Sequence, residues 1–214
     1  MSYSQFTLSK AKEDFRLTYI ENHSFLPNLD PISPSEQLSF FLKDSVPLAI
    51  AMGSEKARSE LIIAPLLLEI WRSFDHKISF FSGEEFNVDA DRGLTGVCDF
   101  LISRSPEQLF PEAPVAVLVE AKKEDLKSGL GQCIAEMVAA QYFNDRKNNP
   151  VQTIYGVVTS GNRWLFLQLE GQVVTLDLQE YSLFPVDKVL SILRWMVVSA
   201  MGQQTESGKA TLKS

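Results

Sequence analysis

One uninterrupted apolar run constrains the fold more than any other feature of this sequence. The residues from Val115 to Val119 are all apolar. A strand with one face in water alternates apolar and polar side chains, whereas a strand covered on both faces is apolar throughout. The run therefore predicts a central β-strand over 115–121, in a sheet with helices packed on both sides.

The size and charge of the chain limit the classes of protein to which such a sheet can belong. The chain has 214 residues, of which 45% are hydrophobic and 22% are charged, as in an ordinary globular domain with a proper core. Its net charge is −7. A protein that coats polyanions is basic, so a histone-like or architectural role is excluded. Any contact with nucleic acid is then a local patch or is bridged by metal.

Apolar periodicity and turn residues predict the other elements. A helix is expected from the N-cap Ser54 to about Arg72, kinked or divided by Pro65. Further helices and strands are expected as follows: strands at 78–81, 86–89, 96–103, 153–159, 164–169 and 172–178, and helices at 125–146 and 186–201. This order predicts an α/β domain with a central mixed β-sheet flanked by helices.

The two ends of the chain are patterned more loosely. Residues 1–53 are interpreted as an N-terminal arm, with short helices at 9–20 and 35–41 separated by prolines. The last residues, 202–214, are expected to form a flexible tail. The organised domain is therefore expected to span 54–201.

Cysteine usage and hydropathy favour a cytoplasmic protein without a membrane segment. Cys98 and Cys133 stand in apolar surroundings without a CxxC motif, and two histidines cannot complete a zinc site. Buried free thiols are expected, with a disulfide as the alternative. The N-terminus lacks the pattern of a signal peptide. The longest apolar stretch, 61–71, is too short to span a bilayer.

Charged residues stand in two places where a buried strand normally has none. The central run leads directly into Glu120 and Lys122, whose side chains point the same way about 7 Å apart. Asp99 interrupts the apolar strand at 96–103. An unpaired buried carboxylate is costly, so a cation normally accompanies it. If the two strands are neighbours, Asp99 and Glu120 can share one metal ion, with Lys122 beside it.

The pattern of Asp99, twenty intervening residues and Glu120-x-Lys122 at a strand end resembles the PD-(D/E)XK nuclease superfamily. Its fold is the restriction-endonuclease-like fold. The helix around Glu60 resembles the first core helix of that superfamily, whose acidic residue completes the metal site in many members. The helix after Lys122 resembles the second core helix, where many branches carry a glutamine, here Gln132. The resemblance covers about 54–169.

The sequence departs from the family pattern at two positions. Cys98 precedes Asp99, where the superfamily motif has proline. Glu136 stands four residues after Gln132, where the RecB-like branch has tyrosine. No segment resembles a DNA-reading module. The branch within the superfamily is therefore not assigned.

The resemblance implies a metal-dependent nuclease, an endonuclease or an exonuclease, that hydrolyses phosphodiester bonds. Mg²⁺, or Mn²⁺ as a substitute, is expected at Asp99, Glu120 and Glu60, because Mg²⁺ prefers oxygen ligands and keeps several waters. Lys122 is expected to orient or deprotonate the attacking water, or to stabilise charge on the phosphate. Gln132 is expected to position water or phosphate through its amide.

The expected partners are nucleic acid, DNA before RNA, and a second copy of the chain. Basic residues near the sheet end are expected to contact the substrate backbone: Lys123, Lys127, Arg92 and Arg104. A homodimer is expected because cutting two strands with one site per chain often uses two chains. The apolar C-terminal helix at 186–201 is its expected contact.

Four other interpretations, two for the whole protein and two for single residues, are open at this point. The chain can be a non-catalytic binding or regulatory protein that retains the nuclease fold, which its negative charge favours. Alternatively, the pair of Glu120 and Lys122 is a purely structural ion pair. At the level of single residues, Glu60 can simply pair with Lys56 four residues earlier, and Gln132 can be an exposed helical residue.

Overall fold

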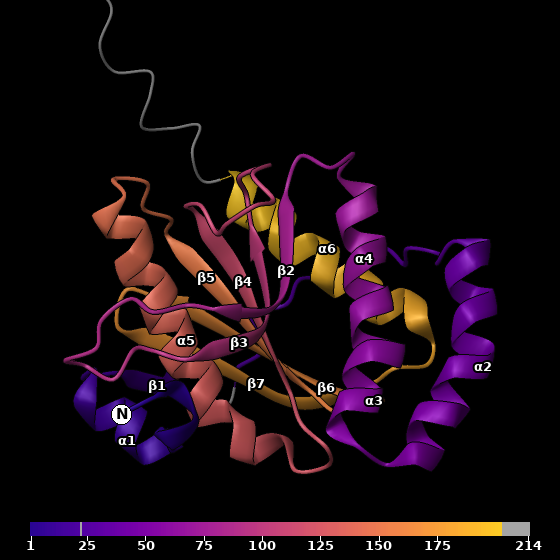
Figure 1. Ribbon diagram of the computed structural model, residues 1–214, viewed down its shortest axis with the longest axis horizontal. Helices are drawn as coiled ribbons and strands as arrows, with labels where there is room; N and C mark the ends of the chain where they lie inside the picture. Colours follow the sequence, from indigo (N-terminus) through magenta and orange to yellow (C-terminus); the bar gives the residue numbers. More distant parts are fainter. Residues whose placement is uncertain (22, 203–214) are drawn as a thin grey trace, which may run out of the picture.

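A computed structural model describes residues 1–21 and 23–202 of the chain (Figure 1). The elements follow in this order: η1 (Tyr3–Gln5), α1 (Leu8–Asp14), β1 (Thr18–Ile20), α2 (Glu36–Met52), α3 (Glu55–Arg58), η2 (Ser59–Ile63), α4 (Ala64–Ser73), β2 (Ser79–Glu85), β3 (Val97–Ser103), β4 (Val115–Ala121), α5 (Leu126–Arg146), β5 (Thr153–Thr159), β6 (Arg163–Glu170), β7 (Val173–Ser182) and α6 (Val186–Gly202). The tail predicted at 202–214 lies outside the described residues, except for Gly202.

The seven strands of the described residues form one mixed sheet, in the order β1-β7-β6-β5-β4-β3-β2. The neighbours β4 and β5 run parallel, as do β1 and β7, while the other neighbours run antiparallel. A parallel pair needs a crossover connection, and α5 provides it between β4 and β5. The predicted class, an α/β domain with a central mixed sheet flanked by helices, is confirmed.

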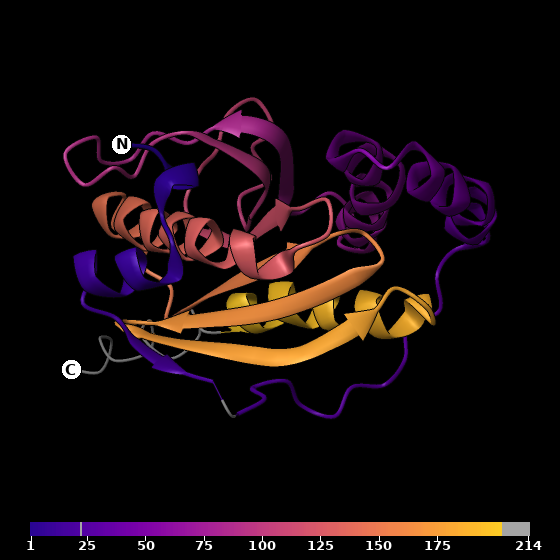
Figure 2. The same cartoon turned by 90° about the horizontal axis from the view of Figure 1, so that it is seen from below.

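Helices cover both faces of this sheet, with α5 on one side of the strands and α6 on the other (Figure 2). The core under η1, α1 and α5 includes Leu118 and Met137. The core under α2, α4 and α6 includes Val119 and Leu193. All residues of β4 are buried between these two cores, which is why its sequence is apolar as far as Glu120. None of the helices in the described part of the chain has the length and apolar character to cross a membrane.

Most strand predictions match, but the strand predicted at 86–89 is wrong. β4 and β5 have the predicted bounds, while the remaining predicted strands differ by a few residues at their ends. In the segment at 86–89, only Asp89 forms a bridge, to Leu94. Phe86 packs from a loop against the ring of Phe143 on α5, with ring centroids 5.2 Å apart. The apolar residue there reflects packing against a helix rather than strand pairing.

The helical segment predicted from Ser54 is present, and Pro65 interrupts it as expected. The Ser54 side chain caps α3 by accepting a hydrogen bond from the backbone N–H of Ala57 at 3.1 Å. Pro65 has no N–H to donate, and its ring crowds the carbonyl four residues earlier. The chain accommodates it with η2, a π-helical turn in which the Ala64 N–H bonds to the Ser59 carbonyl five residues back.

Residues 1–53 add the strand β1 to the sheet and pack helices against its two cores. The helix predicted at 9–20 is wrong in its second half, because α1 ends at Asp14, Arg16 has a φ of 55°, and β1 pairs with β7. The helix predicted at 35–41 continues through Pro47 to Met52, since its buried side chains hold it on the core. The domain boundary at residue 53 stays a prediction.

Both cysteines are buried and free, as the sequence predicts. Cys98 lies on β3 and Cys133 on α5, within the core on the α5 face of the sheet. Burial raises the pKa of both thiols above the ordinary range. They are therefore inert core residues.

Candidate active site at the end of the central strand

Asp99 and Glu120 lie where the ladder between β3 and β4 ends. The last paired residues are Phe100 and Val119, so Asp99 and Glu120 each stand next to that last pair. The backbone N–H of Ala121 donates to Asp99 Oδ2 at 2.8 Å. The sheet therefore brings the two predicted carboxylates to neighbouring strands at one end of the ladder.

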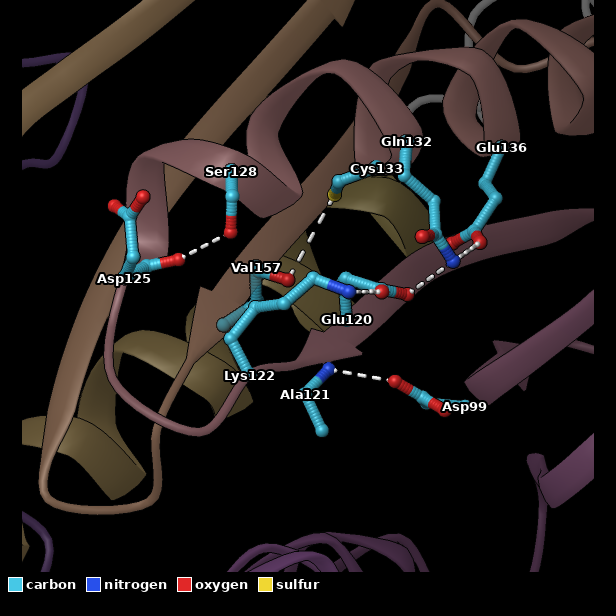
Figure 3. A network of polar contacts seen from close by, with 10 residues as sticks. All are labelled: Asp99, Glu120, Ala121, Lys122, Asp125, Ser128, Gln132, Cys133, Glu136 and Val157. Carbon is cyan, nitrogen blue, oxygen red and sulfur yellow. Dashed lines mark hydrogen bonds and ion pairs between the residues drawn. The ribbon is translucent and has the colours of Figure 1, made fainter. Parts of the chain in front are cut away.

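Glu120 is the centre of a buried polar network (Figure 3). Its side chain is almost inaccessible, with the residue 1% exposed. The Lys122 Nζ ammonium donates to Glu120 Oε1, and the Gln132 Nε2 amide donates to Glu120 Oε2 at 2.8 Å. The same Gln132 nitrogen donates to Glu136 Oε1 at 3.1 Å. The network thus joins the end of β4 to the first turns of α5.

Carboxyl groups outnumber cationic groups in this network. Burial, with the Asp99 charge adding to it and Lys122 opposing, raises the pKa of Glu120 to about 8. Burial and the charge of Glu120 likewise raise the pKa of Glu136 well above its usual value. Among the described residues, three carboxyl groups therefore act on one another beside one ammonium group, that of Lys122. An additional cation would favour the ionised forms of these carboxyls.

Gly129 on α5 makes room for the lysine side chain. A Cβ atom at Gly129 would lie 2.8 Å from Val158 Cγ1 and 3.0 Å from Lys122 Cε. The Lys122 side chain is only 20% exposed, so its stem runs between the helix and the sheet toward Glu120. The absence of a side chain at Gly129 is what allows this path.

Glu60 is not part of the network. It pairs with Lys56 at 2.8 Å, and its side chain is 61% exposed. Glu60 and Asp99 do, however, line the same small cleft of about 250 Å³, together with Glu55 and Ser59. Glu55 also contributes to the electrostatics of Glu120, although burial is the main influence there. Of the five predicted site residues, the structure brings four together and leaves Glu60 on the cleft wall.

The carboxylate oxygens of Asp99 and Glu120 are ligands of the kind that a hard divalent cation prefers. Within residues 1–21 and 23–202, no three His, Cys, Asp or Glu side chains are grouped closely enough to form a ready-made metal cage. Mg²⁺ does not need one, because it keeps several waters and is usually held by one or two carboxylates and the substrate. Asp99 and Glu120 meet that requirement, and the excess of carboxyl groups over cationic groups around Glu120 favours a cation.

Of the four basic residues predicted to contact a substrate, two lie away from the Glu120 network and two lie close to it in the chain. Arg92 Nη1 donates to the Tyr142 hydroxyl at 2.6 Å, and Arg104 Nη1 donates to the Ala200 carbonyl at 2.5 Å. Both side chains are thus engaged away from the network. Lys123 and Lys127 are exposed in the loop after β4 and in the first turn of α5. Of the four predicted basic contacts, Lys123 and Lys127 are thus the two that stand next to the site in the chain.

Glu136 and Gly129 were not identified as site residues from the sequence. The spacing of four residues between Gln132 and Glu136 places both on one face of a helix, and that signal could have found Glu136. Gly129 gives no such signal, since its role depends on how closely α5 approaches β4. A scan against protein-family models and a search of curated proteins found no match. The functional argument therefore rests on the site itself.

Proposed function

We propose that this protein is a metal-dependent nuclease that hydrolyses phosphodiester bonds in nucleic acid, with DNA as the first substrate to test. The observation that carries the proposal is the buried network around Glu120. It combines two carboxylates on adjacent strand ends with a lysine two residues further along and a glutamine from the next helix. A buried carboxylate cluster with too little positive charge is typical of a functional site.

The arrangement of elements supports a restriction-endonuclease-like fold for this nuclease. A helical segment precedes the antiparallel strands β2, β3 and β4, and α5 then leads to β5, which lies parallel to β4. The proposed site residues lie on β3, on and just after β4, and on α5. This is the distribution that the resemblance implies for the superfamily.

In the proposed reaction, Asp99 and Glu120 would hold Mg²⁺. A bound Mg²⁺ supplies polarisation of a phosphate oxygen and lowers the pKa of a coordinated water. Asp99 also accepts the Ala121 N–H, which fixes its orientation toward the end of β4. Glu120 is fixed by Gln132 at 2.8 Å. These contacts keep both carboxylates in position before substrate arrives.

Lys122 and Gln132 act on the attacking water and the phosphate in this proposal. The Lys122 ammonium now lies against Glu120, where it neutralises part of the carboxylate charge. With the Glu120 charge balanced by a bound cation, the flexible Lys122 side chain would be free to orient the water or to stabilise charge on the phosphate. The Gln132 amide has a nitrogen held by carboxylates and an oxygen that can accept a hydrogen bond from water.

Cleavage assays with matched variants test the proposal. Single- and double-stranded DNA and RNA are incubated with Mg²⁺ or Mn²⁺, with EDTA as a control. Asp99→Asn and Lys122→Met are each expected to slow cleavage by about 10²–10⁴-fold. Asp145→Asn, on the exposed end of α5, is the control carboxylate and should cleave normally. Cleavage that persists in EDTA or in both site variants would contradict the proposal.

A non-catalytic binding or regulatory protein is the second candidate. The observation in its favour is that both oxygens of Glu120 are already bonded, to Lys122 and to Gln132. Calorimetric titration with Mn²⁺ distinguishes the two candidates. Binding that disappears in Asp99→Asn supports the nuclease, whereas no binding together with no cleavage supports the second candidate.

A homodimer and a cytoplasmic location stay proposals. The predicted dimer helix α6 packs its apolar side chains into the core of its own chain, Val189, Leu193 and Met196 among them. The exposed large apolar residues of α2 include Phe40 and Leu48, which are 75% and 54% exposed. If a dimer forms, we expect α2 rather than α6 to mediate it. Light scattering of the wild type and of Phe40→Ser measures the molar mass of each, and Phe40→Ser should weaken any dimer of the wild type.

A further inference from the structure

Glu136 lies at the inner end of the network and is fully buried, with 0% exposure. Its Oε1 atom accepts from Gln132 Nε2 at 3.1 Å. Its Oε2 atom is buried and has no hydrogen-bond partner in the part of the chain that the structure describes. A buried polar atom without a partner costs folding free energy. A side chain that is unfavourable for stability at its own position points to a role in function.

The contacts of Gln132 indicate what that role is. Its amide nitrogen donates to carboxyl groups of both Glu120 and Glu136, at 2.8 and 3.1 Å. Since only the nitrogen of an amide carries hydrogens, these two acceptors allow one orientation of the amide. In Figure 3 both dashed lines of Gln132 reach its nitrogen, and none reaches its oxygen. With Glu120 alone as acceptor, the amide would be held at one point and could rotate.

We propose that Glu136 is a positioning residue of the site, which fixes the amide of Gln132. Held in this way, Gln132 keeps the Glu120 carboxylate in place and leaves its own oxygen to accept a hydrogen bond from water or substrate. Glu136 itself touches neither. The proposal rests on the proposed nuclease function and adds a residue to it that acts through Gln132.

Two substitutions separate positioning from structural support. Glu136→Gln keeps a carbonyl oxygen that can accept from Gln132, whereas Glu136→Leu removes the acceptor and the unpaired oxygen together. We expect Glu136→Leu to fold with an unchanged or higher Tm and to lower kcat by about 10-fold or more, with KM unchanged. Glu136→Gln should retain kcat within about 3-fold. Asp145→Asn on the same helix is the control.

A second measurement does not depend on cleavage. The side-chain NH₂ signals of Gln132, assigned by their loss in Gln132→Ala, report on its hydrogen bonds in an NMR spectrum. We expect them at similar positions in the wild type and Glu136→Gln, and shifted and averaged in Glu136→Leu. Equal kcat in the wild type and Glu136→Leu, or equal Gln132 signals in the two Glu136 variants, would overturn the proposal.

Cleavage, Mn²⁺ binding and the Gln132 signals together separate this proposal from the proposed function. A wild type that neither cleaves nucleic acid nor binds Mn²⁺ disproves the nuclease function. If Gln132 signals still shift only in Glu136→Leu, the positioning contact is supported while the nuclease reaction is not. If the wild type cleaves and Glu136→Leu cleaves equally well, the nuclease stands and the role of Glu136 is wrong.

Discussion

Asn144 on α5 brackets the backbone of Val115 at the start of β4. Its Oδ1 atom accepts from the Val115 N–H, and its Nδ2 atom donates to the Val115 carbonyl, each at 2.8 Å. Both residues are buried. This two-point contact lies at the opposite end of β4 from Glu120. It fixes the lengthwise position of α5 on the strand, and with it the distance between Gln132 and Glu120.

We expect Asn144→Ala to destabilise the protein by about 2 kcal/mol or more. Two buried backbone groups lose their partners, and each unsatisfied group costs about 1–3 kcal/mol. The higher helix propensity of alanine offsets only about 0.5 kcal/mol of this. Urea unfolding measures the difference. Asp145→Ala, the exposed neighbour, is the control, and equal midpoints for the two variants would contradict the structural role of Asn144.

The raised pKa of Glu120 predicts a pH dependence of stability with a definite sign. Because its pKa rises from 4.5 to about 8 on folding, the folded protein binds a proton more tightly than the unfolded chain. The tighter proton binding by folded Glu120 therefore adds fully to the free energy of unfolding below about pH 4.5. This contribution is lost as the pH rises toward 8. Between these values the slope is at most about 1.4 kcal/mol per pH unit.

Glu120→Gln isolates this effect, since glutamine does not titrate. The unfolding free energy of the wild type should fall between pH 5.5 and pH 8, and that of Glu120→Gln should fall less. At pH 8 the variant should therefore be more stable than the wild type. Urea unfolding at several pH values measures the difference between the two proteins. Stability of the wild type that rises relative to Glu120→Gln over this range would show that the sign is wrong.

Arg58 ties the first helical segment to the turn between β5 and β6. Its Nη1 atom donates to the Ser160 carbonyl at 2.9 Å and to Asn162 Oδ1 at 2.8 Å. We expect Arg58→Ala to destabilise the protein by about 1–3 kcal/mol, because the buried Ser160 carbonyl loses a donor. Lys56→Ala, two residues earlier and exposed, should change nothing measurable. Thermal unfolding of the two variants tests the contrast.

Gly131 permits the N-terminal segment to lie directly on α5. A Cβ atom at this position would lie 2.3 Å from the Phe6 carbonyl oxygen and 2.4 Å from the Thr7 carbonyl carbon. Since backbone must move to make room, we expect Gly131→Ala to cost about 1–3 kcal/mol. Hydrogen exchange should increase most in η1 and α1. Exchange that increases equally throughout the sheet would argue against a local contact.

The parts of this fold that follow from local patterns were predictable. The bounds of β4 and β5 follow from apolar runs that stay buried on both faces, and the break near Pro65 follows from its missing N–H. The errors occur where distant contacts override local signals. α2 continues through Pro47 because buried leucine and valine side chains hold it on the core, and Phe86 is apolar because it meets Phe143.

By itself, the sequence determined the class of fold and the central strand, because apolar runs encode burial along a strand. The same reasoning marked Asp99, Glu120 and Lys122 as charged residues on or next to buried strands, whereas Gln132 followed only from the family resemblance. Tertiary structure decided which of these residues meet. Glu120 contacts Gln132 and reaches Glu136 through it only because α5 crosses back over β4, and Glu60 turns toward Lys56 instead. Contacts between residues far apart in the chain depend on packing distances of a few ångströms, which no local pattern contains.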